Sequence, residues 1–365
     1  MSRFFGRHPV GHAGHAAWGD RLLATTFVLL AGSLSPLAPQ ALAANDPFVL
    51  EKTLAVPSIP VGPYSDHLAV DLVGKRIFAT PQAAKMVAVL DLQDGHVLKK
   101  LPVGNPHAIY YSSTMKRLFV ADGANGVVDV FNGEDYSLIK TIPIGKGVDW
   151  FICDPHSQLI YVNNGGEEAG MDHSLVSVVD AVKMEKVADI SIPAPALEGS
   201  AIDSDKHLLY VSLDATGAVA VVDLAKRETV ATWKLPSDGH RAMGAALDTT
   251  HARLYVTTRD SSLHGSIIVL DTTNGRTVAT LPIGGWADDI FIDQRRQRIY
   301  VSVGVGRIDT YAIEANDVYR REQSVETALL AKTSQYSNEL DRMYVSVPVL
   351  DDIDAFQVMI FKPLP

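Results

Sequence analysis

Ionisable side chains recur at one fixed spacing along this sequence, twelve residues before a repeated aromatic residue. A position that only packs in a structural repeat carries an apolar or small residue, yet six of these seven positions are ionisable. In chain order they are Asp66, His107, Asp149, Glu198, Met243, Asp288 and Lys332. The next position adds His67, Trp150 and Asp289 in three of the copies. The pattern predicts that these side chains meet in one polar site, which we call the polar ring.

Four consecutive copies contribute a candidate metal site to the polar ring, formed by Asp66, His107, Asp149 and Glu198. Carboxylates with one imidazole suit a divalent metal such as calcium, magnesium or manganese, and they suit zinc less well. Two other interpretations stay open. The polar ring is a solvated acidic surface in which Lys332 screens Asp288, or it is a ligand site without a metal.

Aromatic and cationic side chains near the polar ring are further candidates for ligand binding. Trp150 and Trp286 either stack on a ring or sugar or cover the apolar core. His240 and Arg241 form a cationic pair that either holds an anionic group or makes a surface salt bridge. No catalytic residue is assigned, because the sequence has no GxSxG elbow, no Walker A loop and no GxGxxG after a predicted strand.

The aromatic residue that sets this spacing lies in a short string, of the form Arg-Leu-Tyr-Val, that occurs seven times. Its positions, spaced 41, 42, 49, 45, 45 and 44 residues apart, are Phe78, Phe119, Tyr161, Tyr210, Tyr255, Tyr300 and Tyr344. Each unit predicts four short strands, of which the third is rich in branched residues and the fourth ends in Ile-Pro or Leu-Pro. Because proline cannot donate to a sheet, we expect the fourth strand at the outer edge.

Four antiparallel strands repeated seven times predict an all-β fold, a seven-bladed β-propeller. Only one more strand, at 356–361, follows the last aromatic string. The segment 49–56 precedes the first unit, yet Ile59-Pro60 after it is a fourth-strand ending. We therefore expect this N-terminal strand to close the last blade beside 356–361.

Several of these motifs resemble the YVTN-repeat family of bacterial β-propellers, which includes YncE-like periplasmic proteins. They are LIYVNN at 159–164, RLYVTT at 253–258, IPIG at 142–145 and LPIG at 281–284. The resemblance covers the sequence after residue 43 and implies the seven-bladed fold. It does not imply one function, since similar propellers are lactonases, lyases, electron-transfer subunits or binding scaffolds, and function is decided by the site.

The first 43 residues predict a cleaved secretory signal peptide. A basic start is followed by an apolar run at 22–34 that is too short to span a bilayer, and then by Ala41-Leu42-Ala43 as a cleavage site. An uncleaved anchor is the alternative. We expect residues 44–365 to form one propeller domain, a monomer without a membrane span, in the periplasm or outside the cell.

Charge and cysteine content exclude several classes of protein. The 365 residues include 32 Lys and Arg against 42 Asp and Glu, a formal net charge of −10, which argues against a nucleic-acid partner. The single cysteine, Cys153, excludes a disulfide framework, a four-cysteine zinc site and a CxxCH haem attachment.

The sequence favours a non-enzymatic binding protein whose partner at the polar ring is a small molecule or a protein. One alternative is a metal-dependent hydrolase or lyase, of lactonase or lyase type, in which His107 is the acid or base. Another is a partner subunit in periplasmic electron transfer.

Overall fold

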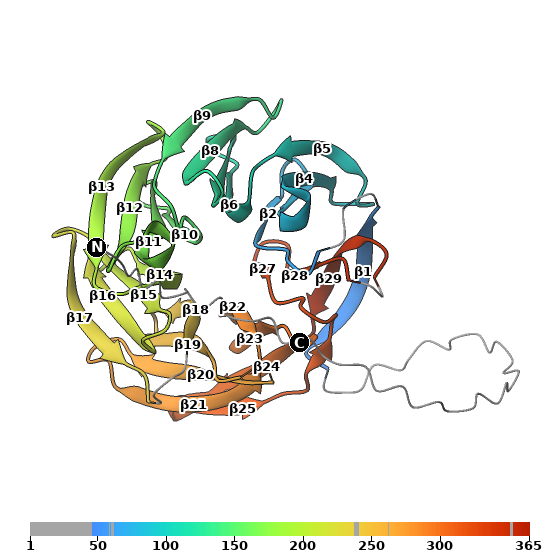
Figure 1. Ribbon diagram of the computed structural model, residues 1–365. Coiled ribbons are helices and arrows are strands. Elements are labelled where there is room, and N and C mark those ends of the chain that lie inside the picture. The colour runs from blue at the N-terminus through green and yellow to red at the C-terminus, as the bar shows by residue number, and fades with distance from the viewer. Residues whose placement is uncertain (1–45, 58, 60–61, 237–240, 262, 351–352) are drawn as a thin grey trace, which may run out of the picture. The chain divides into compact units, whose positions relative to one another are not determined.

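The computed structural model describes residues 46–57, 59, 62–236, 241–261, 263–350 and 353–365. Within this part of the chain, seven β-sheets surround a common axis as the blades of a propeller (Figure 1). The predicted signal peptide, Pro60 and His240 lie outside the described residues, so the signal peptide and the domain boundary at residue 43 stay predictions.

Each blade has four antiparallel strands, to which the sixth blade adds a short fifth strand, and in every blade except the last the strands run outward in chain order. The innermost strands are β2 (Leu68–Asp71), β6 (Pro106–Ser112), β10 (Phe151–Asp154), β14 (Leu197–Asp203), β18 (Arg241–Asp248), β22 (Ala287–Asp293) and β27 (Ser334–Ser337). The second strands are β3 (Arg76–Ala79), β7 (Arg117–Asp122), β11 (Leu159–Gly165), β15 (Leu208–Leu213), β19 (Arg253–Arg259), β23 (Arg298–Val303) and β28 (Arg342–Val347).

The third and fourth strands complete the blades. The third strands are β4 (Met86–Asp91), β8 (Val127–Asn132), β12 (Ser174–Asp180), β16 (Ala218–Asp223), β20 (His264–Asp271), β24 (Arg307–Glu314) and β29 (Phe356–Pro363). The outer strands are β5 (Val97–Pro102), β9 (Leu138–Pro143), β13 (Glu185–Ile192), β17 (Glu228–Lys234), β21 (Thr277–Gly284), β25 (Val318–Arg321) and, in the last blade, β1 (Phe48–Val56).

Helical structure in the described residues is limited to three short 3-10 turns. They are η1 (Gln82–Ala84), η2 (Gly166–Ala169) and η3 (Ala315–Asp317). A search of the described residues finds no helix of the length and hydropathy needed to cross a membrane.

The turn between the first and second strands explains the constant spacing of the repeat. Asp71 ends β2, and its carboxylate accepts hydrogen bonds from the backbone N–H groups of Val73 (3.1 Å) and Gly74 (2.9 Å). Asp248 makes the same kind of turn at the end of β18. The third residue before each repeated aromatic residue has a left-handed backbone, with φ between 51° and 60°, at Lys75, Lys116, Gln158, His207, Ala252, Gln297 and Asp341. One turn geometry therefore sets the distance from inner strand to aromatic residue in every blade.

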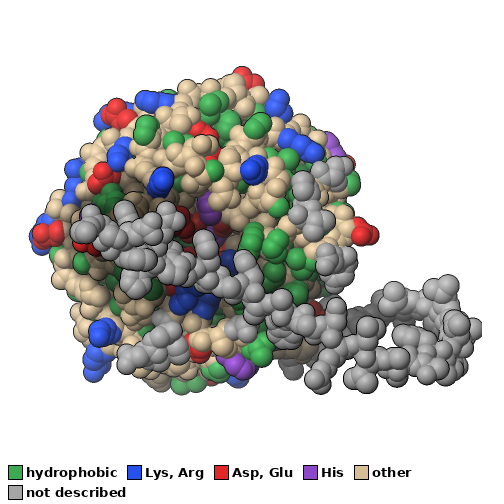
Figure 2. All heavy atoms as spheres, viewed as in Figure 1, with side chains coloured by type: hydrophobic (Ala, Val, Ile, Leu, Met, Phe, Trp, Pro, Cys, Tyr) green, Lys and Arg blue, Asp and Glu red, His purple; other side chains and the backbone are tan. Residues whose placement is uncertain are grey.

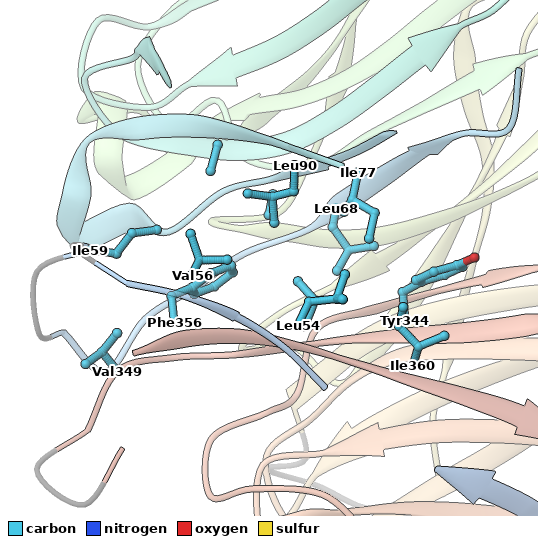
Figure 3. Close-up of a cluster of buried hydrophobic side chains, with 13 residues drawn as sticks. Leu54, Val56, Ile59, Leu68, Ile77, Leu90, Tyr344, Val349, Phe356 and Ile360 are labelled. Atoms are coloured by element: carbon cyan, nitrogen blue, oxygen red, sulfur yellow. The ribbon is translucent and has the colours of Figure 1, made fainter. Parts of the chain in front are cut away.

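The N-terminal strand closes the ring. β1 pairs antiparallel with β29, with Val56 opposite Phe356 at one end. Leu54 and Val56 are buried against Leu68 and Ile77 of the first blade (Figure 3). This arrangement confirms the predicted closure, and it leaves no unpaired seam between the last blade and the first.

Proline ends the outer strands at several of the predicted places. Pro102 ends β5, Pro143 ends β9, and Pro193 directly follows β13. The sixth blade lacks this ending. Its outer edge consists of two short strands, β25 and β26 (Val325–Glu326), which both pair with β24.

Candidate functional site

The residues of the polar ring stand where the chain enters the innermost strands. His107, Glu198 and Asp288 are the second residues of β6, β14 and β22, whereas Asp66 and Asp149 come two residues before β2 and β10. Because the repeat places them at equivalent points of neighbouring blades, their side chains can meet across the ring axis. In Figure 2, acidic, basic and histidine side chains lie together near the middle of the face in view.

The first group of contacts joins three blades around His107. Its Nδ1 atom lies 2.6 Å from a carboxylate oxygen of Asp149 and 2.9 Å from one of Asp66. The side-chain amide of Gln82 donates to the same Asp66 oxygen at 3.0 Å. On the other side of the imidazole, the amide of Asn105 lies 2.7 Å from Nε2. We call Asp66, His107 and Asp149 the acidic pole of the polar ring.

The second group of contacts surrounds His67. Its imidazole lies between a carboxylate oxygen of Asp66, at 3.2 Å from Nε2, and one of Asp289, at 3.4 Å from Nδ1. Asp289 also accepts a hydrogen bond of 2.7 Å from the backbone N–H of Ser334. The edge of the His67 ring meets Trp150, with ring centroids 4.4 Å apart. The indole N–H of Trp150 is buried and has no partner among the described residues.

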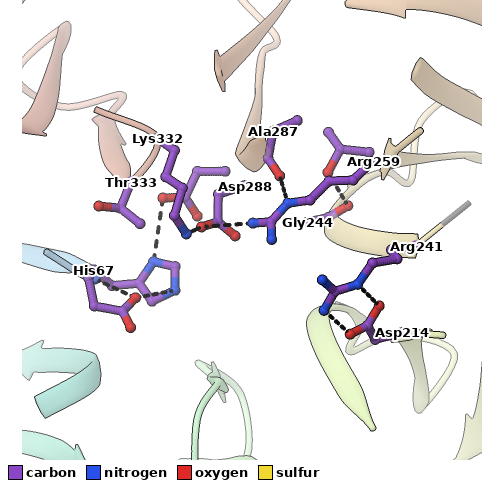
Figure 4. Close-up of polar contacts among 12 residues, drawn as sticks. His67, Asp214, Arg241, Gly244, Arg259, Ala287, Asp288, Lys332 and Thr333 are labelled. Atoms are coloured by element: carbon purple, nitrogen blue, oxygen red, sulfur yellow. Dashed lines mark hydrogen bonds and ion pairs between the residues drawn. The ribbon is translucent and has the colours of Figure 1, made fainter. Parts of the chain in front are cut away.

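The third group of contacts pairs one carboxylate with two cations (Figure 4). Asp288 forms ion pairs with Lys332 and, at 3.4 Å, with Arg259. The Nε–H of Arg259 donates to the backbone carbonyl of Ala287 at 3.1 Å, and its guanidinium lies 5.7 Å from the ring centroid of Trp286. We call Asp288, Arg259 and Lys332 the basic pole of the polar ring.

Glu198 lies outside the cluster of donor atoms in the acidic pole. Among the described residues, the acidic pole's donor atoms gather within 4.8 Å of one another without it, so the expected four-residue metal set reduces to three. Burial raises the pKa of Glu198, and the negative charges of Asp149 and Asp288 raise it further, well above its ordinary value. A carboxyl group with this pKa keeps its proton at a pH where exposed glutamates have lost theirs.

Arg241 pairs with a residue that the sequence analysis did not connect to it. Its Nε–H donates to a carboxylate oxygen of Asp214 at 2.6 Å, as Figure 4 shows. Asp214 is buried, whereas the side chain of Arg241 is half exposed. This pair is the salt bridge that was one of the two expectations for Arg241, and the expected role of His240 lies outside the described residues.

Neighbouring carboxylates raise the pKa of both histidines of the polar ring. Burial lowers the pKa of His67, but the charges of Asp289 and Asp66 outweigh burial and raise it to about 10. Burial also lowers the pKa of His107, and hydrogen bonds to Asp149 and Asp66 raise it to about 10. His107 therefore faces carboxylates of the two adjacent blades, whereas His67 faces one carboxylate of its own blade and one of the sixth blade.

Two carboxylates that face cations, Asp66 and Asp288, have lowered pKa values, whereas burial raises the pKa of Asp289. Burial raises the pKa of Asp66, but His67 and His107 outweigh burial and hold it well below its usual range. Burial raises the pKa of Asp288 as well, and the charges of Lys332 and Arg259 outweigh it, so the net shift is downward. The polar ring is thus a set of interlocked charges rather than a row of separately solvated acids.

The fold of the described blades resembles that of a solved propeller. A chain of the Kuenenia stuttgartiensis hydrazine synthase aligns with a TM-score of 0.67 over 79% of this chain and 94% of that chain, at 18% sequence identity. At this identity the likeness concerns the fold alone. No family model matches the sequence.

Curated relatives come from Escherichia and Salmonella strains. The sequence is 24% identical to YncE of Salmonella typhimurium over 198 residues, or 54% of this chain and 53% of that protein. It is 28% identical to YncE of Escherichia coli K12 over 130 residues, or 35% of this chain and 34% of that protein. The protein is a YncE-like seven-bladed β-propeller. Its matches span from a third to about half of the length of these relatives, so their partners and activities do not transfer to it.

Three side chains of this YncE-like propeller's site escaped the sequence analysis, and they share a second spacing. Gln82, Asp214 and Arg259 each come four residues after the repeated aromatic residue, where the second strand ends. The other blades carry glycine or proline at that position, at Gly123, Gly165, Gly304 and Pro348. The departure from glycine or proline is the signal that would have found them.

Together, the two poles give the YncE-like propeller a polar ring with complementary binding chemistry. The acidic pole offers two carboxylates and an imidazole nitrogen, which become donors for a cation when that cation displaces the Nδ1 proton of His107. The basic pole places two cations against one carboxylate. Its three side chains therefore have a net positive charge, which can bind an anionic group.

Proposed function

We propose that this YncE-like propeller is a binding protein that holds a small polar ligand at the polar ring. The observation that carries the proposal is the interlocking of charges from six blades, most of them at the entries to the innermost strands, with Arg259 at the end of a second strand. Ion pairs of this kind add little net stability compared with well-packed apolar residues, because both charges lose their hydration. Burial and neighbouring charges also shift pKa values, and groups with strongly shifted pKa values cluster at functional sites.

The distribution of charge supports a ligand that carries an anionic group. Arg259 and Lys332 both face Asp288, and one of the two positive charges is left for a carboxylate or phosphate. The buried, unpartnered indole N–H of Trp150 is a further donor. A buried donor without a partner costs free energy, and a ligand oxygen would recover it.

We further propose that the protein works in the periplasm or outside the cell. The support is the basic start, the short apolar run at 22–34 and the Ala41-Leu42-Ala43 cleavage site. A binding protein in that compartment meets small charged solutes directly.

A second candidate function is a hydrolase or lyase in which Glu198 is the general acid. The observation that favours it is the raised pKa of this carboxyl, which keeps its proton to a higher pH than an exposed glutamate does. The test is turnover of small lactones and esters by the wild type and by Glu198→Gln. Turnover that the variant lacks supports catalysis, and an inactive wild type contradicts it.

The binding proposal is tested by thermal unfolding with a panel of small dicarboxylates, sugar phosphates and amino acids. A ligand of the folded state raises the melting temperature with its concentration. We expect one class to stabilise the wild type and to lose this effect in Arg259→Gln. The control is Arg320→Gln, because the exposed Arg320 pairs with Glu314 on the outer edge of the sixth blade.

Two outcomes would contradict the proposal. One is a panel that leaves the melting temperature of the wild type unchanged. The other is a stabilising ligand that acts equally on Arg259→Gln and on Arg320→Gln, because it would bind elsewhere on the protein.

A further inference from the structure

We propose that the acidic pole is a binding site for one divalent metal ion of the manganese class, with Asp66, His107 and Asp149 as ligands. This inference deepens the proposed function, because a metal here would give the small polar ligand a second point of attachment at the polar ring. It concerns the cation alone and is tested without the ligand.

The spacing of the donor atoms fits a metal ion. One nitrogen and two carboxylate oxygens converge, with Nδ1 of His107 at 2.6 Å from Asp149 and 2.9 Å from Asp66. Adjacent ligands of an octahedral ion with bonds of 2.1 Å are about 3.0 Å apart. Both distances from Nδ1 therefore lie within a few tenths of an ångström of this separation, and all three donor atoms lie within 4.8 Å of one another.

The imidazole of His107 is held from behind in the way that metal-binding histidines are. The amide of Asn105 lies 2.7 Å from Nε2, and a half-turn of that amide presents its oxygen to an Nε2–H. The backbone N–H of Asn105 donates to Asp122 at 3.0 Å, which fixes the segment that carries the amide. A partner on the second nitrogen sets the tautomer and aims the first nitrogen at the metal.

Gly123 provides the room that this imidazole needs. A Cβ atom at this position would lie 2.7 Å from both Nε2 and Cδ2 of His107. The backbone of Gly123 does not have the positive φ that requires glycine. Glycine is therefore present for space, so that the ring can stand with Nδ1 toward the carboxylates.

The acidic pole also leaves coordination positions open. The side chain of Asp149 is 41% exposed, so water or an anionic ligand can reach the same centre. Gln82 lies 3.1 Å from Nδ1 of His107, and turning its amide supplies an oxygen as a fourth ligand.

The mixed ligand set decides the class of metal. Carboxylate and amide oxygens suit magnesium, calcium and manganese, whereas imidazole suits zinc, iron and copper. Manganese accepts both kinds of donor, and the site has no thiolate to favour a softer ion. Calcium, which takes oxygen ligands, fits less well because one of the three donors is a nitrogen.

The test is titration of the chelator-treated protein with Mn²⁺, followed by calorimetry and by electron paramagnetic resonance. We expect one ion per chain, with a nitrogen coupling from His107 in the spectrum. Asp149→Asn should weaken binding by about tenfold or more, and His107→Gln should also remove the nitrogen coupling. Asp149 forms an ion pair with His107 and is partly exposed, so this variant is expected to fold.

Two controls locate the ion. Glu168→Gln changes an exposed acid in η2 and should leave the titration unchanged. Asp94→Asn tests a second cluster of potential ligands, formed by Asp91, Asp94 and His96, which is mostly exposed. Binding that is lost in Asp94→Asn and kept in Asp149→Asn would overturn the inference, as would a wild type that binds no Mn²⁺.

The inference and the proposed function fail separately. Mn²⁺ that binds at His107 while no anionic compound stabilises the protein would support the metal site and contradict the ligand proposal. Stabilisation by an anionic compound that requires Arg259, found together with no Mn²⁺ binding, would support the ligand proposal and overturn the metal site.

Discussion

The Nδ1 atom of His107 lies 2.6 Å from a carboxylate oxygen of Asp149. The two residues lie at or just before the start of the innermost strands of two adjacent blades. Neither belongs to the apolar packing that joins the blades. Their contact depends on the repeat. Because the turn between the first and second strands has the same length in each blade, the residues at the start of each innermost strand lie at equivalent positions in neighbouring blades. The first expected consequences concern the charges around this contact.

Replacing Glu198 with glutamine should stabilise the protein at pH 8. The folded state holds a proton on Glu198 at a pH where the unfolded state, with the ordinary pKa of 4.5, has released it. Stability therefore falls as pH rises above about 4.5, because the folded state binds more protons than the unfolded state. Glu198→Gln removes this cost, by roughly 1.4 kcal/mol for each unit of pKa shift.

The measurement is urea unfolding of the wild type and Glu198→Gln at pH 4 and pH 8. The gain should be present at pH 8 and small at pH 4, where both states of the wild type are protonated. Glu167→Gln, which changes an exposed acid, is the control. An equal gain at both pH values would mean that the raised pKa is not its cause.

Replacing Asp288 with asparagine should destabilise the fold. Lys332 and Arg259 would then face each other without their carboxylate, and breaking a buried pair costs about 3 kcal/mol. The double variant Asp288→Asn with Lys332→Met removes one of the stranded charges. It should recover part of the loss in chemical denaturation.

An exposed ion pair provides the comparison. Glu134→Gln breaks the contact with Lys116 on the surface and should change stability little. If Asp288→Asn has as small an effect as Glu134→Gln, the basic pole is solvated and our description of it is wrong.

Leu54→Ala should destabilise the protein by about 2–5 kcal/mol, because it opens a cavity between the closing strand and the first blade. Leu50 on the same strand is 46% exposed, compared with 1% for Leu54. Leu50→Ala should therefore have a small effect. Similar losses from both variants in thermal unfolding would contradict the packing of β1 that closes the ring.

The blades were predictable from the sequence, because each repeat contains the turn and strand residues that determine its own local structure. The Asp71 turn and the aromatic Phe78 recur in equivalent form in other units, so register and strand order follow from counting. The closing strand was predictable for the same reason, since Ile59-Pro60 is an outer-strand ending placed before the first blade.

The contacts of the polar ring were only partly predictable. Counting places Asp66, His107 and Asp149 at one level, but it cannot tell which neighbour each carboxylate meets. Glu198 shares their register and yet stands apart from their cluster. Arg259 comes from the far end of a second strand, a position that counting from the inner strands does not reach.

Gly123→Ala should weaken Mn²⁺ binding without removing a ligand. The added Cβ would lie 2.7 Å from the imidazole of His107, which must turn away from the carboxylates. The fold should persist, because the closest atoms belong to the end of a side chain and the backbone oxygen of Val148 lies farther away, at 3.3 Å. Calorimetry that shows unchanged affinity in this variant would contradict the role given to this glycine.

The most direct test of the binding site is anomalous diffraction from crystals of the protein soaked in Mn²⁺. The account predicts one strong peak among Nδ1 of His107 and the carboxylates of Asp66 and Asp149, with these donors moved apart from their present 2.6 and 2.9 Å. A structure in which the soaked crystals show no peak there, and in which the imidazole keeps both carboxylate contacts, would contradict it.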